Sequence, residues 1–295
     1  MNEVIIIIFC DEGFGDQYAS LITAYNVIPI LREKGYNPKI FISKEHKYFS
    51  LKTPISVIYN LSIFNCDIEE MRYEEIKQRL GGYKLISFSS IQIWVKEKNN
   101  ELDDFNYSNV TRYNIHNILS SPKLNEDLIN KDILELSKKF ILGKKNIAAL
   151  HFRSGDAYMK SDINHIMQDE FWNSQFKKSY EFIEKNSEYD ILICSSNSKV
   201  VNHFCEKYKN TFRSEFSNPN MPMHRIYGHD FQEDDSIYIS HAKEIYSEMV
   251  SLKYAKKIFS VNHFSSNFVL YGIINNVNYD SWQSKLTNLV YNGNI

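Results

Sequence analysis

The chain has 295 residues, of which 43% are hydrophobic and 24% are charged, and its formal net charge is −2 at pH 7. This composition is typical of a globular protein with one large domain or two of ordinary size. Because acidic and basic residues nearly balance, nucleic acid is excluded as a general partner, and an anionic ligand needs a local cluster of cations.

Two further features bear on location and redox state. The N-terminal stretch carries an acidic residue and too short an apolar run for a signal peptide, and no run reaches the roughly 18 apolar residues of a membrane span. The 4 cysteines, Cys10, Cys66, Cys194 and Cys205, are widely spaced, and three lie in or beside apolar segments. We therefore expect a cytoplasmic protein with reduced thiols.

A buried strand followed by a helix is predicted at the start of the chain. Val4–Phe9 is an uninterrupted apolar run, short enough to be a buried parallel strand. Apolar residues at helical spacing continue over residues 18–34 and stop at Gly35. The strand, its turn and the helix form half of a βαβ unit.

The turn between them contains Gly13 and Gly15 but not the Gly-x-Gly-x-x-Gly spacing of a dinucleotide site. Two interpretations stay open. The turn is either a plain connection in which Asp16 caps the helix, or a cleft-facing turn in which Glu12 or Asp16 acts as a base or hydroxyl ligand.

Alternating strands and helices over the rest of the first half predict a parallel sheet. The pattern indicates strands at residues 39–43 and 84–88 and helices at residues 69–80 and 125–142. Residues 94–121 are interpreted as loops. Because the last helix ends at Gly143, we predict two domains, residues 1–143 and 144–295.

The stretch with the most candidate ligand-binding residues follows this boundary. An apolar run over residues 147–150 leads into His151 and Arg153 and stops at Gly155 and Asp156, which indicates a buried strand that ends in a polar turn. Alternation places the imidazole and the guanidinium on one side of the strand. An arginine at this end of a strand suits bidentate phosphate binding, whereas an ion pair with Asp156 is the structural alternative.

A second βα unit comes next. The pattern predicts a helix, a strand and a helix at residues 170–185, 190–194 and 199–208. The strand ends in the hydroxyl-rich sequence Ser195-Ser196-Asn197. A long loop over residues 212–236 follows, and since its histidines match no zinc spacing we expect no metal site there.

The last motif combines an acidic helix, a strand and a hydroxyl-rich turn. The helix is predicted at residues 244–255, the strand at residues 257–261, and Ser265 and Ser266 lie in the turn that starts another helix. The free N–H groups of such a helix start can bind an anion, although N-capping by serine is the simpler explanation of the turn taken alone.

In this order, the His-x-Arg-x-Gly-Asp motif, the strand ending in serine, and the acidic helix, strand and Phe-Ser-Ser turn resemble the GDP-fucose-dependent fucosyltransferase superfamily. This superfamily includes α-1,2-, α-1,6- and protein O-fucosyltransferases. The resemblance covers residues 145–275 and, in the first half, only the glycine turn. The chain departs from the family pattern at residues 195–197, where the family typically has Ser-Asp-Asp.

The resemblance implies an α/β fold of two Rossmann-like domains facing one another across a cleft, the GT-B arrangement. Residues 1–143 would be the acceptor side, and residues 144–295 would bind the nucleotide-sugar donor and end in a helix near residues 281–290. The implied activity is inverting transfer of a sugar, with L-fucose as first choice, from a GDP-sugar to a hydroxyl of a glycan. No metal or cofactor is expected, and a membrane-linked acceptor at the inner membrane face is compatible with this activity.

The resemblance also implies roles for single residues. Arg153 would hold the β-phosphate and stabilise the departing diphosphate. His151 and Glu248, with Glu244 as the substitute for Glu248, would bind the guanine. The catalytic base is predicted from the residues themselves and not from the resemblance: it is a carboxylate of the first domain, Asp16 ahead of Glu12, beside the glycines of the first turn. The other expected donor-binding residues are Gly155, Asp156, Ser195, Ser265 and Ser266.

A second class of function stays open. The chain could be a non-catalytic α/β protein that binds a nucleotide or sugar, or a GDP-sugar enzyme of another reaction type. An epimerase is disfavoured because no dinucleotide motif follows a strand, and a hydrolase or kinase is disfavoured because Gly-x-Ser-x-Gly and Walker motifs are missing.

Overall fold

The computed structural model describes residues 2–10, 14–44, 55–88, 91–96, 127–152, 161–195, 197–215 and 235–261. The chain divides into two compact units, Met1–Asn130 with Ile226–Ile239, and Lys131–Arg225 with Ser240–Ile295. Residues 131–143, which the sequence placed before the domain boundary, belong to the second unit. The division into an acceptor side and a donor side at residue 143 stays a prediction.

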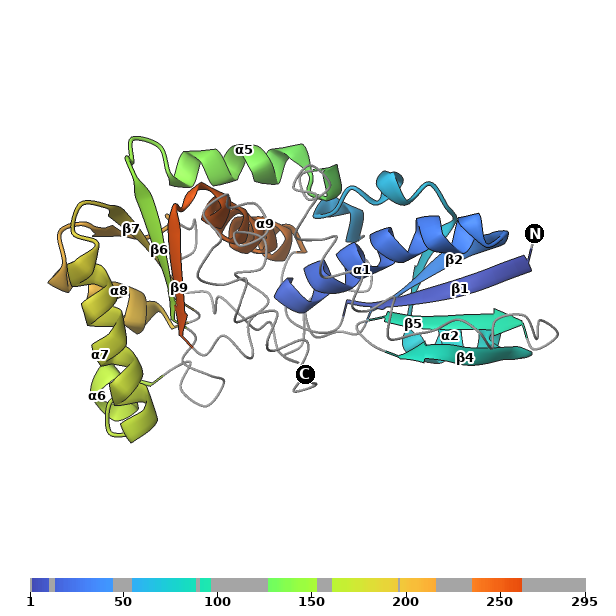
Figure 1. Ribbon diagram of the computed structural model, residues 1–295, viewed down its shortest axis with the longest axis horizontal. Coiled ribbons are helices and arrows are strands. Elements are labelled where there is room, and N and C mark those ends of the chain that lie inside the picture. Colours follow the sequence, from blue (N-terminus) through green and yellow to red (C-terminus); the bar gives the residue numbers. More distant parts are fainter. Residues whose placement is uncertain are drawn as a thin grey trace. The chain divides into compact units, whose positions relative to one another are not determined.

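The first unit contains a five-stranded sheet in the order β3-β2-β1-β5-β4 (Figure 1). The strands are β1 (Asn2–Phe9), β2 (Tyr36–Ser43), β3 (Ile68–Met71), β4 (Tyr83–Phe88) and β5 (Ile91–Lys96). β1, β2 and β3 run parallel, whereas β5 runs antiparallel to both β1 and β4. The sheet is therefore mixed, and the prediction of a parallel sheet was wrong for its second half.

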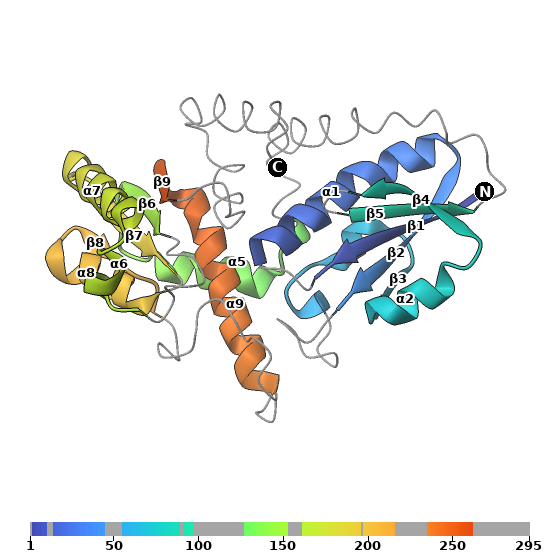
Figure 2. The same ribbon diagram turned by 90° about the horizontal axis from the view of Figure 1, so that it is seen from below.

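Helices α1 (Phe14–Glu33) and α2 (Tyr73–Arg79) cover opposite faces of this sheet (Figure 2). Burial on both faces explains why β1 is apolar at successive positions and does not alternate. Its Ile5 and Ile7 pack with Phe41 and with Ile76 of α2. Gly35 follows α1 with a φ of +81°, a left-handed conformation that suits glycine and ends the helix where the sequence predicted.

Two short strands of the first unit differ from the sequence prediction. β3 occupies residues expected to begin a helix, because its two glutamates have basic partners beside the sheet. Glu69 pairs with Lys39 at 2.5 Å, and Glu70 pairs with Lys44 at 2.9 Å. β5 was not predicted, and residues 94–96 were expected to be loop, but they form part of a strand because β5 pairs on both sides. Local sequence therefore yielded to tertiary pairing at both places.

The second unit is built on a sheet of four parallel strands in the order β8-β7-β6-β9. The strands are β6 (Ile147–Phe152), β7 (Asp190–Cys194), β8 (Thr211–Phe212) and β9 (Lys257–Val261). The helices are α5 (Lys131–Phe140), α6 (Ile163–Ile166), α7 (Glu170–Lys185), α8 (Ser198–Lys207) and α9 (Asp235–Ser251) with the 3-10 turn Leu252–Tyr254. The first five residues of α9, up to Ile239, belong to the first unit. The strands and helices predicted between residues 147 and 208 and at residues 257–261 are confirmed.

The helices of this unit lie on two faces of the sheet, with α7 and α8 on one and α5 and α9 on the other (Figure 1). The α7 and α8 face is an aromatic layer in which Phe152 of β6 lies 4.5 Å from Phe176 and 5.9 Å from Phe204, measured between ring centroids. Alternation along β6 turns His151 to the other face, toward α5 and α9. The expected loop at residues 212–236 is described to residue 215, and residues 262–271 and the C-terminal helix near residues 281–290 lie outside the described residues.

Candidate functional site

The strand order of the second sheet creates a point where the direction of winding reverses. From β6 the chain proceeds to β7 and β8 on one side, and β9 later pairs with the other side of β6. The crevice at the carboxyl ends of the two strands that flank such a reversal is the usual ligand site of an open α/β sheet. β6 and β9 end side by side here, with Phe152 paired to Val261.

The segments that follow these two strands carry most of the residues predicted to bind the donor. Arg153, Gly155 and Asp156 come directly after β6, and Ser265 and Ser266 come shortly after β9. All five lie outside the described residues, so their roles stay predictions. The topology does establish that both motifs leave the sheet from neighbouring strands.

His151 is held inside the sheet immediately before this edge. Its side chain is buried, and its Nδ1 atom lies 3.0 Å from the Oγ atom of Ser260 on β9. The register pairs His151 with Cys194 on one side and with Ser260 on the other, so the three residues form a row across the sheet. Ser260 was not singled out from the sequence, although a hydroxyl residue inside the apolar run of β9 was a visible signal.

Ser195 has a structural contact at the end of β7. Its hydroxyl accepts a hydrogen bond from the backbone N–H of Asn197 at 3.2 Å, and the Asn197 side chain caps α8 by accepting from the Lys199 N–H at 2.9 Å. Both Ser195 and Asn197 are buried. These residues therefore shape the turn into α8, and donor binding by Ser195 stays a prediction.

Glu248 reaches the same region from α9. Its side chain is buried, and burial raises the pKa of its carboxyl to about 8, with a smaller opposing effect of the Ser214 hydroxyl. Burial, with a contribution from the charge of Glu248, also raises the pKa of the Cys194 thiol at the end of β7. A carboxyl group from α9 thus acts electrostatically on the carboxyl end of β7.

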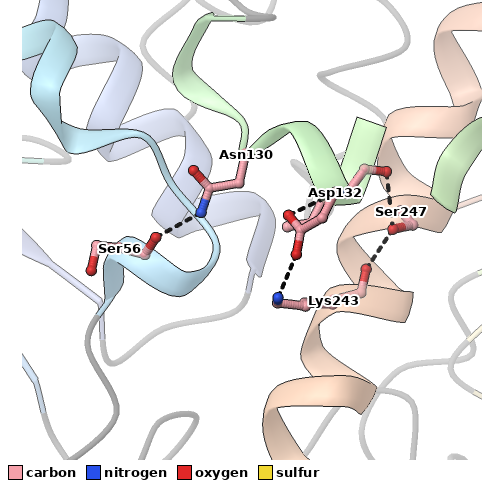
Figure 3. Close-up of polar contacts among 6 residues, drawn as sticks. Ser56, Asn130, Asp132, Lys243 and Ser247 are labelled. Atoms are coloured by element: carbon pink, nitrogen blue, oxygen red, sulfur yellow. Dashed lines mark hydrogen bonds and ion pairs between the residues drawn. The ribbon is translucent and has the colours of Figure 1, made fainter. Parts of the chain in front are cut away.

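The position of Glu248 is supported by contacts between α5 and α9 (Figure 3). Asp132 at the start of α5 pairs with Lys243 of α9. The Ser247 hydroxyl donates to the Lys243 carbonyl at 2.6 Å and also lies 3.2 Å from the Ile133 carbonyl of α5. These contacts come from the turn of α9 that directly precedes Glu248 and hold it against α5.

A cavity of about 940 Å³ opens beside Glu248 within the second unit. Its walls come from α5, the start of α8, the segment that follows β8, and α9. The lining combines three cations, two acids and several apolar side chains: Leu136, Lys139, Phe140, Leu142, Lys144, Ser198, Val201, Phe212, Arg213, Ser214, Glu215 and Glu248. Its volume falls in the range of small-molecule sites.

Glu244, the substitute for Glu248, is also buried but does not line this cavity. Its Oε2 atom lies 3.9 Å from Nδ1 of His241, one turn earlier on α9. The geometry therefore favours Glu248 over Glu244 as the carboxyl that a ligand in the cavity would meet.

In the first unit, Asp16, the residue predicted to be the catalytic base, lies at the start of α1. Gly15 and Asp16 belong to the first turn of this helix, but the Asp16 side chain, like Glu12 and Gly13, lies outside the described residues. Gln17 is buried and donates from Nε2 to the Cys10 carbonyl at 3.2 Å, which ties the helix start to the end of β1. The roles of Asp16 and Glu12 stay predictions.

Two further surveys bear on the site. Within the described ranges, no group of three or more His, Cys, Asp or Glu side chains is arranged to hold a metal ion. None of the described helices combines the length and the apolar character that a bilayer crossing requires. Cys10, Cys66, Cys194 and Cys205 are all free thiols, as expected.

Comparisons with known proteins give a likeness of structure. No protein-family model and no curated protein sequence matches the chain. NodZ α-1,6-fucosyltransferase soaked with GDP-fucose matches with a TM-score of 0.51 and 11% identity, over 93% of this chain and 92% of that one. NodZ from Bradyrhizobium matches with a TM-score of 0.48 and 10% identity, over 92% of this chain and 93% of that one.

At this identity the first match shows a shared fold over nearly the whole chain. The resemblance to fucosyltransferases that the motifs suggested is therefore confirmed at the level of the fold.

Proposed function

We propose that the chain is a glycosyltransferase that takes its sugar, L-fucose, from GDP-fucose and passes it to a hydroxyl of a glycan. The observation that carries the proposal is the buried Glu248 carboxyl at the wall of a cavity that lies on the β8 side of a parallel sheet. The fold shared with a fucosyltransferase that was soaked with GDP-fucose supports it.

The hydrogen-bonding groups of guanine explain why we propose this nucleobase. Its Watson–Crick edge presents two neighbouring donors, N1–H and the 2-amino group, and an ionised carboxylate can accept from both at once. Adenine presents an acceptor at N1 and would leave a buried carboxylate unpaired, which is costly. We therefore assign the cavity to the nucleoside and Glu248 to the guanine edge.

The spacing of the strands fits a nucleoside diphosphate. The cavity assigned to the nucleoside is lined from β8, and the reversal lies between β6 and β9, two to three strands further along the sheet. Since neighbouring strands lie about 4.8 Å apart, the nucleobase and the diphosphate would be separated by roughly 10–14 Å along the sheet edge. An extended GDP can span this distance, which brings its phosphates to the loop that begins with Arg153.

In the proposed reaction, the oxygen of an acceptor hydroxyl attacks C1 of the sugar from the face opposite the diphosphate. The new C1–O bond forms as the bond from C1 to the β-phosphate oxygen breaks, so the configuration at C1 is inverted. Arg153 stabilises the negative charge that moves onto GDP. The hydroxyl proton passes to a carboxylate of the first unit, Asp16 ahead of Glu12. No metal ion is needed in this scheme.

The proposal places the acceptor glycan at the first unit, with the two units facing one another across a cleft as in the GT-B arrangement. It places the protein in the cytoplasm, where a membrane-linked acceptor at the inner membrane face is also accessible. A protein that binds GDP-sugars without transferring them, or that catalyses another reaction, would give the same binding data but no glycoside product.

A nucleotide panel tests the proposal. GDP should raise the melting temperature and ADP and UDP should not, because a ligand at 100 times its dissociation constant stabilises the folded state by about 2.7 kcal/mol. IDP lacks the 2-amino group and should bind more weakly than GDP. The variant Glu248→Gln should lose this preference for GDP over IDP.

The matched control is Glu215→Gln, because this acid also lines the cavity but is exposed to solvent. It should keep the preference of the wild type. Equal stabilisation by GDP, ADP and UDP would contradict the guanine assignment, and a screen of GDP-sugars for hydrolysis and transfer then separates an enzyme from a binding protein.

A further inference from the structure

A buried hydroxyl in β9 has no evident role in packing. Ser260 is 4% exposed, while its neighbours Phe259 and Val261 pack with the aromatic layer on the other face of the sheet. An alanine or valine at this position would avoid the cost of burying a hydroxyl, which is about 1–3 kcal/mol when no partner compensates. The partner in this protein is His151, whose Nδ1 lies 3.0 Å away.

We infer that Ser260 is a positioning residue that fixes the ring orientation and the tautomer of His151 for donor binding, a role that rests on the proposed function. The two residues are directly paired in the parallel register of β6 and β9, so both backbones are held by the sheet. Forming the hydrogen bond therefore restricts only the side chains of Ser260 and His151, because the sheet already holds both backbones. It fixes the imidazole at the penultimate residue of β6, two positions before Arg153 of the same motif.

The tautomer follows from what the site has to bind. Guanine O6 and the phosphate oxygens are acceptors, so Nε2 has to carry a proton if this atom is to donate to the nucleotide. This requires the Ser260 hydroxyl to donate to Nδ1, which leaves the proton on Nε2. Cys194, on the other flank of His151, is a poor substitute for the serine because a thiol is a weak hydrogen-bond donor.

The experiment compares variants at position 260 by calorimetric GDP binding and by ¹⁵N NMR of the His151 ring. Ser260→Ala should weaken GDP binding about tenfold, which corresponds to about 1.4 kcal/mol, and should shift the ring nitrogens toward a mixture of tautomers. Ser260→Thr keeps the hydroxyl and should restore both. Ser260→Cys preserves the size of the side chain and should behave like alanine, so it serves if the alanine variant folds poorly.

A double-variant comparison separates positioning from packing. His151→Ala should weaken GDP binding, and adding Ser260→Ala to it should weaken binding no further, because Ser260 acts through the imidazole. The control Ser179→Ala removes another buried hydroxyl, whose Oγ donates to the Gln175 carbonyl at 2.8 Å on α7. It should leave both GDP affinity and the NMR signature unchanged.

The outcomes distinguish the two proposals. If the wild type binds GDP and Ser260→Ala binds it equally well with an unchanged His151 tautomer, the inference is wrong and the proposed function stands. If the wild type does not bind GDP at all, the proposed function is wrong and the inference falls with it.

Discussion

Glu248 shows how one buried carboxyl couples the candidate site to pH. Burial raises its folded-state pKa from the ordinary 4.5 to about 8. The folded protein therefore holds a proton that the unfolded chain releases between these two values. In the proposed assignment the ionised form of Glu248 accepts from guanine, so the carboxyl group would carry its proton in the empty site at neutral pH and release it when the nucleobase binds.

The first prediction follows from this proton. The free energy of unfolding should fall as pH rises from about 4.5 to about 8, because the folded state binds more protons there, and the contribution should be constant outside this window. Glu248→Gln removes the ionisable group. Across this pH range the difference between the two melting temperatures should therefore change, because the melting temperature of the wild type should fall relative to that of the variant as pH rises. Parallel curves would mean that the carboxyl is already ionised in the fold.

The second prediction concerns Arg153, which directly follows β6. Arg153→Lys should nearly abolish transfer and leave the melting temperature unchanged, because a point ammonium cannot reproduce a forked contact with phosphate. Turnover with GDP-fucose is the measurement. A rate within about threefold of the wild type, or ~0.6 kcal/mol of barrier, would rule out the phosphate role.

The third prediction separates a catalytic base from a structural role of Asp16, which lies in the first turn of α1 and not at its N-cap. Asparagine keeps the size of aspartate and an oxygen that accepts hydrogen bonds, but it cannot take a proton. If Asp16 is the base, Asp16→Asn should lose about a hundredfold or more in turnover at unchanged stability. If its role is structural alone, rate and stability should both be retained, and the base is then another group such as Glu12.

At the scale of elements, helices and strands were predicted most accurately where the hydrophobic periodicity and the residues that end each element agree. β6, α7, β7, α8 and β9 were predicted nearly residue by residue, because apolar strands alternate there with amphipathic helices that have clear ends. β3 was missed because Ile-Glu-Glu-Met has helical character by itself. Its strand state depends on Lys39 and Lys44, which lie about 30 residues earlier and which no local pattern connects to it.

The candidate site was predictable to a similar degree. His151 and Glu248 were found from motif order, since both occupy recognisable positions in a strand and an acidic helix. The His151–Ser260 pair was not, because it depends on which strand lies beside β6, and single-strand patterns contain no register. The cavity was also beyond prediction, because its walls come from four elements that are far apart in the chain.

The fourth prediction belongs to β3. Glu70 pairs with the buried Lys44 and also accepts from the Ile55 N–H at 3.0 Å. Glu70→Gln should lower the free energy of unfolding by about 2 kcal/mol or more, because it leaves a buried ammonium without its carboxylate. Its neighbour Glu69 pairs at the surface, so Glu69→Gln should cost less than about 1 kcal/mol. Urea denaturation of both variants makes the comparison, and equal losses would contradict the burial argument.

At the scale of the whole molecule, the fold matches a fucosyltransferase over 92% of that chain at 11% identity, and no family model matches the sequence. Such a combination is expected when a site rests on a few polar residues at strand ends while the supporting core can be exchanged freely among apolar side chains.

The fifth prediction concerns the complete reaction. Transfer should survive EDTA, because in the proposed scheme the charge of the diphosphate is met by Arg153 and by backbone N–H groups at a helix start. Initial rates with and without chelator, measured on the purified full chain, test this. Loss of activity that manganese restores would show that a metal ion belongs to the reaction.

The pairing of β6 with β9 also has a consequence for synthesis on the ribosome. β6 is made about a hundred residues before its partner, and until residues 257–261 leave the exit tunnel one edge of β6 stays open. An open apolar edge strand readily pairs with other chains. Growing chains that stop short of β9 should therefore need chaperones and should aggregate when released, whereas chains that extend past it should close the sheet and join His151 to Ser260 in the same step.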